Sequence, residues 1–472
     1  MYYNISKKVI LLIYIPWILS IITFYHPVLS YSIAWAGSFF IFYITIISSF
    51  RCVSYDLPMR HQIMRPIILI QLVFAGFMCS TSIFYFLDHL GYTYFQRTNG
   101  SSFLVNEQTY SIAECQRLAL LAHTAISTGL ILLIKPLPHL KYFIRLKKIP
   151  FLVNNCIIAY VVAMSLTFIP GLIQFKQPLI NISITCSAYL LITGIVERNH
   201  LSLLFGSAAF TANITNSILS GYKEAVILNI ILLVFLAYPY YKRIVLIMAL
   251  PTIYLLLYAL PTFTNIIRMQ SWTQKKTKTQ AGTQAYQTLF QEQHEKEIIT
   301  TNWEFLTDRF SEIGMFTSYV KQASDDQFYD ETSIIKNTIL SLIPRILWPE
   351  KPNTEKIAME RVYKFGIANR ASPVSAKTRP VVDAYLIAGP AGVFIMMLTY
   401  GLVVQSICNR AEMLFGGYQY GCIVIFNSLF QVLWRGNTLE FLVNNIMYSY
   451  ILMVIIHWFL RKTKVLIPVA VS

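Results

Sequence analysis

A short segment rich in proline and in cations is the part of the sequence whose residue types best suit chemistry. Residues 335–352 read IKNTILSLIPRILWPEKP, and their apolar run, too short to cross a membrane, ends at the first of three prolines. Because proline fixes its own φ angle and restricts the residue before it, we predict a stiff, non-helical loop. The loop would display Arg345 and Lys351, with Trp348, a residue type common at membrane interfaces, between them. These cations could hold a phosphate group, or simply meet the head groups of surrounding lipid.

Further charged residues in the same region are candidates for the rest of a site. Asp383 begins an apolar stretch, where it could act as a general base toward a hydroxyl or be a carboxylate favoured by a helix N-terminus. Glu331 and His294 are the alternative bases. Arg370 and Arg379 flank a stretch rich in serine and proline, and could bind phosphate or sugar or be solvated loop charges. Four aromatic residues could stack on sugars, although interfacial anchoring is the simpler interpretation of most of them: Trp272, Trp303, Tyr363 and Tyr385.

The elements that must position these residues are membrane-spanning helices. Of the 472 residues, 56% are hydrophobic and only 13% are charged, whereas a typical soluble domain is about 25% charged. This composition excludes an ordinary soluble enzyme, a disordered protein and a small disulfide scaffold. The seven cysteines form no CxxC pattern and no cluster with histidine, so we expect no metal site.

Apolar stretches long enough to cross a bilayer recur along the chain, and we count twelve of roughly 20 residues each. The first follows two lysines and lacks a clear small-residue cleavage site, so we expect an uncleaved anchor. The sequence therefore predicts an all-α polytopic membrane protein with about twelve transmembrane helices. The stretches lie near residues 8–26, 29–50, 66–87, 116–134, 150–170, 179–196, 200–220, 224–241, 244–263, 381–407, 415–434 and 442–460.

The basic residues are distributed unevenly between the short loops. If the N-terminus is cytoplasmic, 17 Lys and Arg fall in the inner loops and 5 in the short outer loops. The positive-inside tendency then predicts that both termini are cytoplasmic and that the net charge of +16 reflects topology rather than nucleic-acid binding. We expect nine helices in residues 1–263, a large outer loop domain in residues 264–380, and three helices in residues 381–472.

One part of the expected loop domain has a helical pattern. Its apolar residues recur at three- and four-residue steps, which predicts a helix that either rests on the membrane surface or packs on the spans. The residues are Trp303, Leu306, Phe310, Ile313, Phe316 and Val320.

The proline-rich segment resembles a known signature. IPRILWPEKP is similar to the "iPR-x-lWP-x-KP" pattern of the bacterial O-antigen and exopolysaccharide repeat-unit polymerases of the Wzy type, which also lies late in a large outer loop. Weaker likenesses are GYKEAVILNIILLV at 221–234, VVDAYLIAGPAGVFIMMLTYG at 381–401 and VLWRGNTLEF at 432–441. Lys223 stands where the family more often has arginine. The likeness covers about residues 221–460.

The resemblance implies an architecture like that of GT-C glycosyltransferases and an enzyme of the bacterial inner membrane. Such an enzyme would transfer a glycan from undecaprenyl pyrophosphate to a sugar hydroxyl of a second lipid-linked unit, with cations rather than a metal or cofactor facing the departing pyrophosphate. Its partners would be the lipid-linked oligosaccharide, membrane lipids, and possible chain-length co-polymerase and flippase proteins. Together with the residue patterns above, the resemblance makes Arg345, Lys351, Arg435 and Asp383 the expected catalytic residues. The expected substrate-binding residues are Lys223, Trp348, Arg370, Arg379 and Tyr385.

Other functions remain open from the sequence. An O-antigen ligase has similar architecture, but a catalytic histidine would be expected in the large loop, where His294 is the one histidine. A flippase or transporter of lipid-linked sugar would need polar or charged residues near the membrane midplane, and the expected spans contain few apart from His123 and His457. A non-catalytic assembly partner usually has few spans and a coiled-coil outer domain.

Overall fold

The two ends of the chain fold together, and the middle forms a unit of its own. The computed structural model describes residues 8–53, 58–94, 96–97, 105–135, 140–144, 148–220, 223–268, 277, 280, 282–283, 286, 302–325, 331–345, 347–370, 377–418, 420–435 and 437–469. Residues 1–145 and 307–472 make up the first unit, and residues 146–306 make up the second. The helices after residue 307 therefore belong with spans from both ends of the chain.

Long apolar helices dominate the described residues. Eight of them are long and apolar enough to cross a membrane, which makes this an all-α membrane protein. These helices cover nine of the twelve expected stretches, because one long helix takes in two of them. They are Pro27–Ile47, Pro66–His89, Glu107–Leu133, Ile149–Phe168, Gly171–Val196, Glu224–Thr264, Pro380–Leu414 and Leu439–Lys462.

Two of the remaining expected stretches are also helical. The first forms α1 (Lys8–Ile22), which has 15 residues and contains a proline. The stretch near 200–220 forms α9 (His200–Leu219), which has 20 residues.

The stretch expected to span at 415–434 is not one continuous helix. It divides into α17 (Tyr420–Cys422), the π-helix η8 (Ile423–Asn427) and α18 (Val432–Arg435). Gly416 and Gly417 lie near its start, before α17, with φ angles of 81° and 88°, a left-handed conformation that glycine adopts without a Cβ clash. Most of its described side chains are buried, and an irregular backbone in a membrane protein is tolerated where other protein segments cover it.

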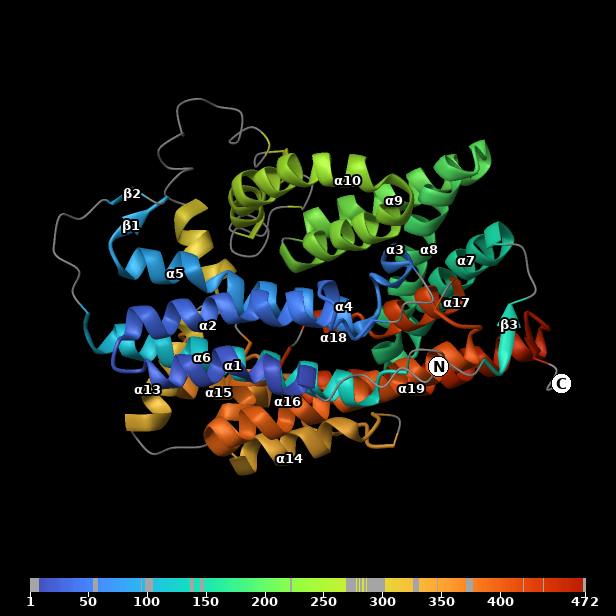
Figure 1. Cartoon of the computed structure of the whole chain (residues 1–472). Coiled ribbons are helices and arrows are strands. Elements are labelled where there is room, and N and C mark those ends of the chain that lie inside the picture. The colour runs from blue at the N-terminus through green and yellow to red at the C-terminus, as the bar shows by residue number, and fades with distance from the viewer. Residues whose placement is uncertain are drawn as a thin grey trace. The chain divides into compact units, whose positions relative to one another are not determined.

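Helices α6 (Glu107–Leu133) and α16 (Pro380–Leu414) lie side by side at the centre of the first unit (Figure 1). They approach closely at Gly129 and Gly401, where an added Cβ would lie 2.4 Å and 2.3 Å from backbone oxygens of the other helix. Small residues allow such backbone contact between membrane helices. α16 departs from helical geometry at Ala388 and Gly389, next to Pro390, so the turns that carry Asp383 are offset from the rest of the helix.

The other elements of the first unit surround this pair. Besides α1, they include α2 (Pro27–Phe42) with the π-helix η1 (Tyr43–Ile47), α3 (Met59–Gln62), α4 (Pro66–Phe74) with the π-helix η2 (Ala75–Ser80), α5 (Ser82–His89) and the last helix, α19 (Leu439–Lys462). Two short antiparallel pairs join β1 (Tyr92–Thr93) to β2 (Gln96–Arg97) and β3 (Tyr142–Ile144) to β4 (Leu466–Pro468).

The periodic apolar pattern near 303–320 forms helices, as the sequence predicts. The π-helix η7 (Phe305–Phe310) is followed by α13 (Ile313–Asp325), and the break between them comes near Ser311. Ile313, Phe316 and Val320 of α13 are buried, and the helix contacts α5, α6 and α16. Of the two interpretations left open, packing on the spans is the one observed for α13.

Two further helices lead from α13 to α16. α14 (Glu331–Leu342) lies along α19, and α15 (Thr354–Lys364) begins after the proline-rich loop (Figure 1). Asn353 caps α15 by accepting the backbone N–H groups of Glu355 and Lys356 at 3.0 Å and 3.3 Å. A capping residue directly after three prolines fixes where this helix starts.

The second unit is built from helices alone among its described residues. Gly194 and Gly206 lie where α8 and α9 touch, and an added Cβ on either would meet the backbone of the other helix at 2.5 Å or less. The long α10 has non-helical geometry at Tyr241, between the two stretches that the sequence separates. The elements are α7 (Lys148–Ser165), the 3₁₀ turns η3 (Leu166–Phe168) and η4 (Pro170–Phe175), α8 (Lys176–Val196), α9 and α10 (Lys223–Arg268).

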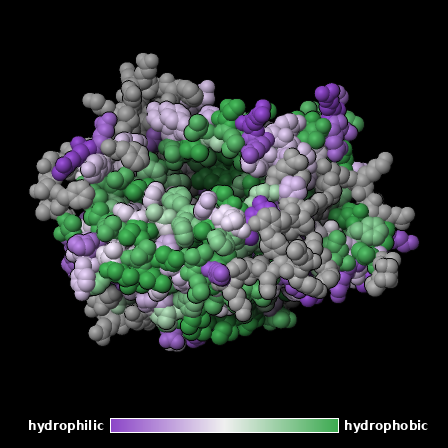
Figure 2. Space-filling model, viewed as in Figure 1, coloured by the Kyte–Doolittle hydropathy of each residue, from purple (hydrophilic) through white to green (hydrophobic). Residues whose placement is uncertain are grey.

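Large apolar side chains are exposed on many of the spans. Leu11 of α1 is 74% exposed and Leu250 of α10 is 76% exposed. Figure 2 shows apolar side chains gathered over the face that carries α1 and α2. Exposed apolar surface of this extent is expected where a helix faces lipid rather than water.

Candidate functional site

The proline-rich segment forms a braced turn after α14. A helix end leaves backbone carbonyls without partners inside the helix, and α14 ends at Leu342. The ammonium of Lys351 donates to the Ser341 carbonyl at 3.1 Å and to the Ile343 carbonyl at 2.7 Å. The side-chain amide of Asn444 in α19 donates to the Ser341 carbonyl at 2.5 Å. The loop is therefore held both by its own lysine and by the last helix.

The two cations of this loop have different surroundings. Lys351 is 7% exposed, and its burial, helped by the positive charge of Arg345, lowers its pKa. Arg345 is half-buried and donates from Nη1 to the Lys351 carbonyl at 3.2 Å. Because a guanidinium has five N–H donors, this bond leaves Arg345 able to hold an anion as well. Lys351 thus braces the loop, while Arg345 and the half-exposed Trp348 are the groups it presents.

A buried ion cluster lies beside this loop and joins three helices. The guanidinium of Arg361 in α15 donates to the carboxylates of Asp383 in α16 and Glu440 in α19. Asp383 also accepts the backbone N–H of Leu439, the first residue of α19, at 2.7 Å. None of the three charged side chains is more than 3% exposed. We call Arg361, Asp383 and Glu440 the carboxylate cluster.

A fourth helix contributes a neutral side chain to the carboxylate cluster. Asn337 of α14 donates one side-chain N–H to Glu440 Oε1 at 3.0 Å and donates to the Thr354 carbonyl at 3.2 Å. Since both partners are acceptors, the orientation of this amide is fixed, with its oxygen on the other side. The hydroxyl of Ser341 donates to the Thr338 carbonyl at 2.7 Å, and its oxygen lies 3.1 Å from the Glu440 backbone carbonyl oxygen. Ser341, whose carbonyl accepts from Lys351, therefore also contacts Glu440 of the carboxylate cluster.

Several buried polar atoms of this region lack a hydrogen-bond partner within the part of the chain that the structure describes. They include Glu440 Oε2, Asn337 Oδ1 and the hydroxyl of Tyr319, on residues that are 2%, 1% and 0% exposed. Burial raises the pKa of Tyr319, as does the negative charge of Asp383, and the charge of Arg361 opposes this only in part. Tyr319 is therefore a neutral hydroxyl that can donate, whereas the other two atoms can only accept.

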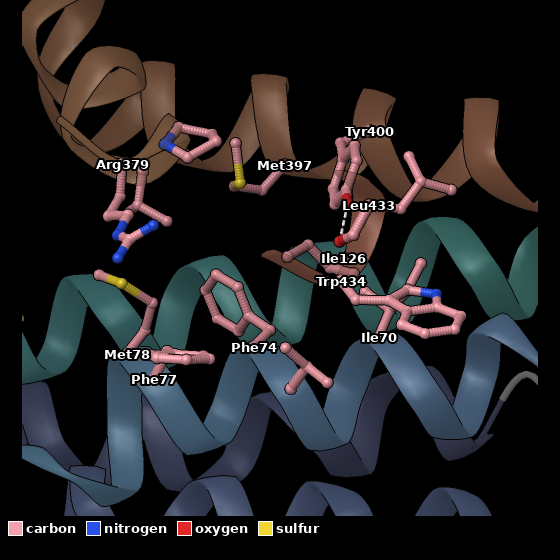
Figure 3. Close-up of a pocket in the computed structure, with 13 residues that line it drawn as sticks. Ile70, Phe74, Phe77, Met78, Ile126, Arg379, Met397, Tyr400, Leu433 and Trp434 are labelled. Atoms are coloured by element: carbon pink, nitrogen blue, oxygen red, sulfur yellow. Dashed lines mark hydrogen bonds between the residues drawn. The ribbon is translucent and has the colours of Figure 1, made fainter. Parts of the chain in front are cut away.

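Arg379 lies just before α16 and closes one end of an apolar pocket (Figure 3). Its guanidinium pairs with Glu312 at 2.5 Å and lies over the ring of Phe77, 5.8 Å from the centroid. Figure 3 shows Trp434 of α18 at the opposite end of the pocket. The cavity has a volume of only about 30 Å³, so it is closed to anything much larger than a water molecule.

The walls of this pocket come from α4, η2, α6, α16 and α18. Phe74 and Met397 face it from two sides, and Tyr400 donates its hydroxyl to the Leu433 carbonyl at 2.6 Å (Figure 3). Among its lining residues Arg379 alone carries a charge. The pocket thus combines apolar walls with a cation at one end, as a lipid combines an apolar chain with an anionic phosphate. In this structure the cation, Arg379, is paired with Glu312.

Two residues predicted to bind substrate have other surroundings. Tyr385 is 3% exposed, and its ring meets Phe316 edge-on with centroids 6.2 Å apart, so it packs in the core and presents no face to a sugar. Arg370 forms an exposed ion pair with Glu360 at 2.5 Å and lies over the ring of Tyr363.

Most of the other predicted site residues have side chains outside the described part of the chain. The side chains of Lys223 and Arg435 lie outside the described residues, as do His294 and Trp272 entirely. The backbone of Lys223 begins α10 in the second unit, and that of Arg435 ends α18 in the first. Glu331 is exposed at the first residue of α14.

The structure therefore brings together Arg345, Lys351 and Asp383 and adds residues that the sequence did not single out. Arg361 gives no sequence signal, because it lies in the charged run TEKIAMERVYK. Glu440 had one, since it is an acidic residue at the start of the last apolar stretch, inside the weakly similar VLWRGNTLEF. Among the described residues, no three His, Cys, Asp or Glu side chains are grouped to hold a metal ion.

Comparison with known proteins gives a family but no described relative. No curated protein matches the chain, and no solved structure matches it. One family model matches residues 15–468, nearly the whole chain, and therefore spans both units and every residue of the site. The chain belongs to the family described as "Domain of unknown function (DUF8712)".

Proposed function

We propose that this protein polymerises oligosaccharide repeat units carried on undecaprenyl pyrophosphate, at the outer face of the bacterial inner membrane. The reaction transfers a glycan from its lipid pyrophosphate to a sugar hydroxyl of a second lipid-linked unit. Such a reaction needs positive charge where the pyrophosphate departs and a carboxylate near the attacking hydroxyl.

One observation carries the proposal: a presented cation and a pair of carboxylates belong to a single hydrogen-bonded assembly. Arg345 donates to the Lys351 carbonyl, and Lys351 donates to the Ser341 carbonyl, which also accepts from Asn444 of α19. Asn337, on the same helix as Ser341, donates to the Glu440 carboxylate. Glu440 shares Arg361 with Asp383. The groups for the two halves of the reaction are thus held by the same end of α14.

Each group has a role in this proposal. Arg345 contacts the departing pyrophosphate as a forked donor, because Lys351 is already bound to backbone carbonyls. Trp348 and the 76% exposed Leu347 hold the loop at the membrane interface. Arg379, which pairs with Glu312 beside the apolar side chains of Phe77 and Met78, is a second cation that could meet a lipid phosphate.

The proposal includes a GT-C-like arrangement with twelve membrane crossings and both termini in the cytoplasm. The excess of basic residues in alternate loops supports this topology, and the eight candidate spans together with α1, α9 and the broken stretch at 415–434 provide the apolar segments. A chain-length co-polymerase and a flippase are the protein partners that such a polymerase would work with.

A reconstituted reaction tests the proposal. Purified protein is incubated with a defined undecaprenyl-pyrophosphate oligosaccharide in the presence of a chelator, and the products are separated on a gel. We expect a ladder spaced by one repeat unit. Arg345→Ala should slow chain growth about 10²- to 10³-fold, the usual loss when one electrostatic donor is removed. The matched control is Lys336→Ala, which removes an exposed cation on α14.

Three outcomes would contradict the polymerase. A normal ladder in Arg345→Ala would remove the role of the loop. Transfer of glycan to a lipid A core acceptor without chain growth would indicate a ligase. Movement of the intact lipid-linked sugar across liposome membranes, with no new glycosidic bond, would indicate a flippase.

A further inference from the structure

The carboxylate cluster contains two candidates for the base, and their surroundings differ. Both oxygens of Asp383 have partners: Oδ1 accepts from Arg361, and Oδ2 accepts the Leu439 N–H at 2.7 Å. Glu440 uses only Oε1, which accepts from Arg361 and from Asn337. Glu440 Oε2 has no hydrogen-bond partner among the described residues.

A second unpartnered acceptor lies on the neighbouring side chain. Asn337 is 1% exposed and its Oδ1 also lacks a partner in the described part of the chain. Its N–H groups face Glu440 and the Thr354 carbonyl. If the oxygen and nitrogen of this amide were exchanged, its oxygen would face these two acceptors and its N–H groups would lose both partners. Buried polar atoms are almost always paired, so two unpartnered acceptors on neighbouring side chains call for a donor.

The charges give the same answer. Arg361 supplies one positive charge against two carboxylates, and its side chain is 1% exposed while those of Asp383 and Glu440 are 0% and 3% exposed. An unbalanced buried carboxylate is stabilised by further hydrogen-bond donors, and a bound sugar hydroxyl would supply one. Within the described part of the chain, the charged and titratable groups near Glu440 include Arg361 from α15, Asp383 from α16 and, near those two, Tyr319 from α13.

We propose, resting on the polymerase function above, that Glu440 is the catalytic base and that Asn337 and Arg361 position it. Glu440 Oε2 takes the proton of the acceptor hydroxyl, and Asn337 Oδ1 accepts a second hydroxyl of the same sugar. The hydroxyl oxygen forms a bond to the anomeric carbon of the donor glycan as the bond from that carbon to the phosphate oxygen breaks. The pyrophosphate leaves with the electron pair, and Glu440 then releases its proton to water. Asp383 holds Arg361 and the first turn of α19 in place.

The decisive comparison is between two variants that remove one carboxylate charge each. Glu440→Gln is nearly isosteric and can keep its oxygen toward Arg361, so the protein should fold. We expect its rate of chain growth to fall about 10²-fold or more, the usual contribution of a base, while KM for the lipid-linked oligosaccharide changes by less than about threefold. Asp383→Asn must point an amide N–H at either Arg361 or the Leu439 N–H, so it should lose stability and yet keep a higher turnover per folded molecule than Glu440→Gln.

The control is Glu355→Gln, which replaces an exposed carboxylate on α15 that pairs with Lys377. If Glu440→Gln fails to fold, Glu440→Asp keeps the charge and the pairing with Arg361 but withdraws the oxygen by one methylene, and we expect a lower kcat with KM retained. A Glu440→Gln protein that grows chains like the wild type would overturn the inference and leave the polymerase standing. A wild-type protein that forms no ladder would instead overturn the polymerase. Greater loss per folded molecule in Asp383→Asn than in Glu440→Gln would return the role of base to Asp383.

Discussion

Each end of α16 carries a carboxylate that is paired with a buried arginine from another helix or loop. The two ends differ in whether every carboxylate has a balancing positive charge and a partner for each oxygen. Asp383 and Glu412 are separated by 29 residues of one helix, or roughly 40 Å. Near its C-terminus, Glu412 receives two bonds from Arg65, from Nε at 3.1 Å and from Nη2 at 3.4 Å. Gln62 accepts Arg65 Nη1 at 2.6 Å, and the ring of Tyr418 lies 5.4 Å from the guanidinium.

Among the described residues, Arg65 and Glu412 form a balanced pair of one charge against one, and both carboxylate oxygens are bound. The carboxylate cluster has one cation for two carboxylates, and Glu440 Oε2 has no partner among the described residues. Removing water from charges is expensive, so an unsatisfied buried carboxylate is unfavourable unless a ligand or a proton completes it. The difference suits a structural role for the balanced pair and supports the proposal that the unbalanced cluster is the reaction site.

Removing each arginine should give the largest effect and separate the two ends. Arg65→Leu leaves one unpaired carboxylate and should cost about 3–5 kcal/mol of unfolding free energy, the range for breaking a buried ion pair. Arg361→Leu leaves two, so its loss should be larger still and little folded protein should accumulate. Thermal unfolding in detergent and the monodisperse yield measure both. Arg370→Leu, which breaks an exposed pair, is the control and should cost no more than about 1 kcal/mol. Equal losses for Arg361 and Arg65 would contradict the difference in charge balance.

A smaller effect is expected where the braced loop meets the carboxylate cluster. Lys351→Met removes two bonds from an ammonium to the Ser341 and Ile343 carbonyls, and hydrogen bonds from charged groups are worth about 1.5–3 kcal/mol. We expect a lower melting temperature together with slower chain growth, because Arg345 and Glu440 both depend on this end of α14. Lys336→Met on the exposed side of α14 should change neither. Slower chain growth without any loss of stability would instead assign Lys351 a direct contact with substrate.

The smallest effect should come from replacing both members of the balanced pair at once. Well-packed apolar residues often substitute for a buried ion pair without loss, so Arg65→Met combined with Glu412→Leu should keep the unfolding free energy within about 1 kcal/mol of the wild type. Chain growth should persist. Full loss of polymerisation in this folded double variant would mean that the second end of α16 also serves the reaction.

The sequence predicted the parts of the molecule that rest on local rules. Prolines 344, 349 and 352 predicted the end of α14 and a loop before α15, and the helices have these bounds. The apolar runs predicted spans, and eight helices meet that description. Hydrophobic length and proline geometry act over a few neighbouring residues, which is why such features can be predicted without the fold.

The roles of single side chains depended on contacts between distant residues. Lys351 and Arg345 are equivalent cations in the sequence, yet only Lys351 reaches the open carbonyls of α14. Tyr385 has the composition of a sugar platform but meets Phe316 in the core. Continuous hydropathy at 415–434 could not indicate the breaks around η8, because burial by other helices makes them possible.

By itself, the sequence determined the class of protein, most of its spans and the rigid cationic loop, because composition and periodicity are properties of the chain alone. The tertiary structure decided the carboxylate cluster. Arg361, Asp383 and Glu440 come from separate helices and meet only because α14, α15, α16 and α19 pack at one end of the first unit. The charge balance and the unpartnered oxygen depend on which groups lie together in a space from which water is excluded. Only the tertiary packing determines this.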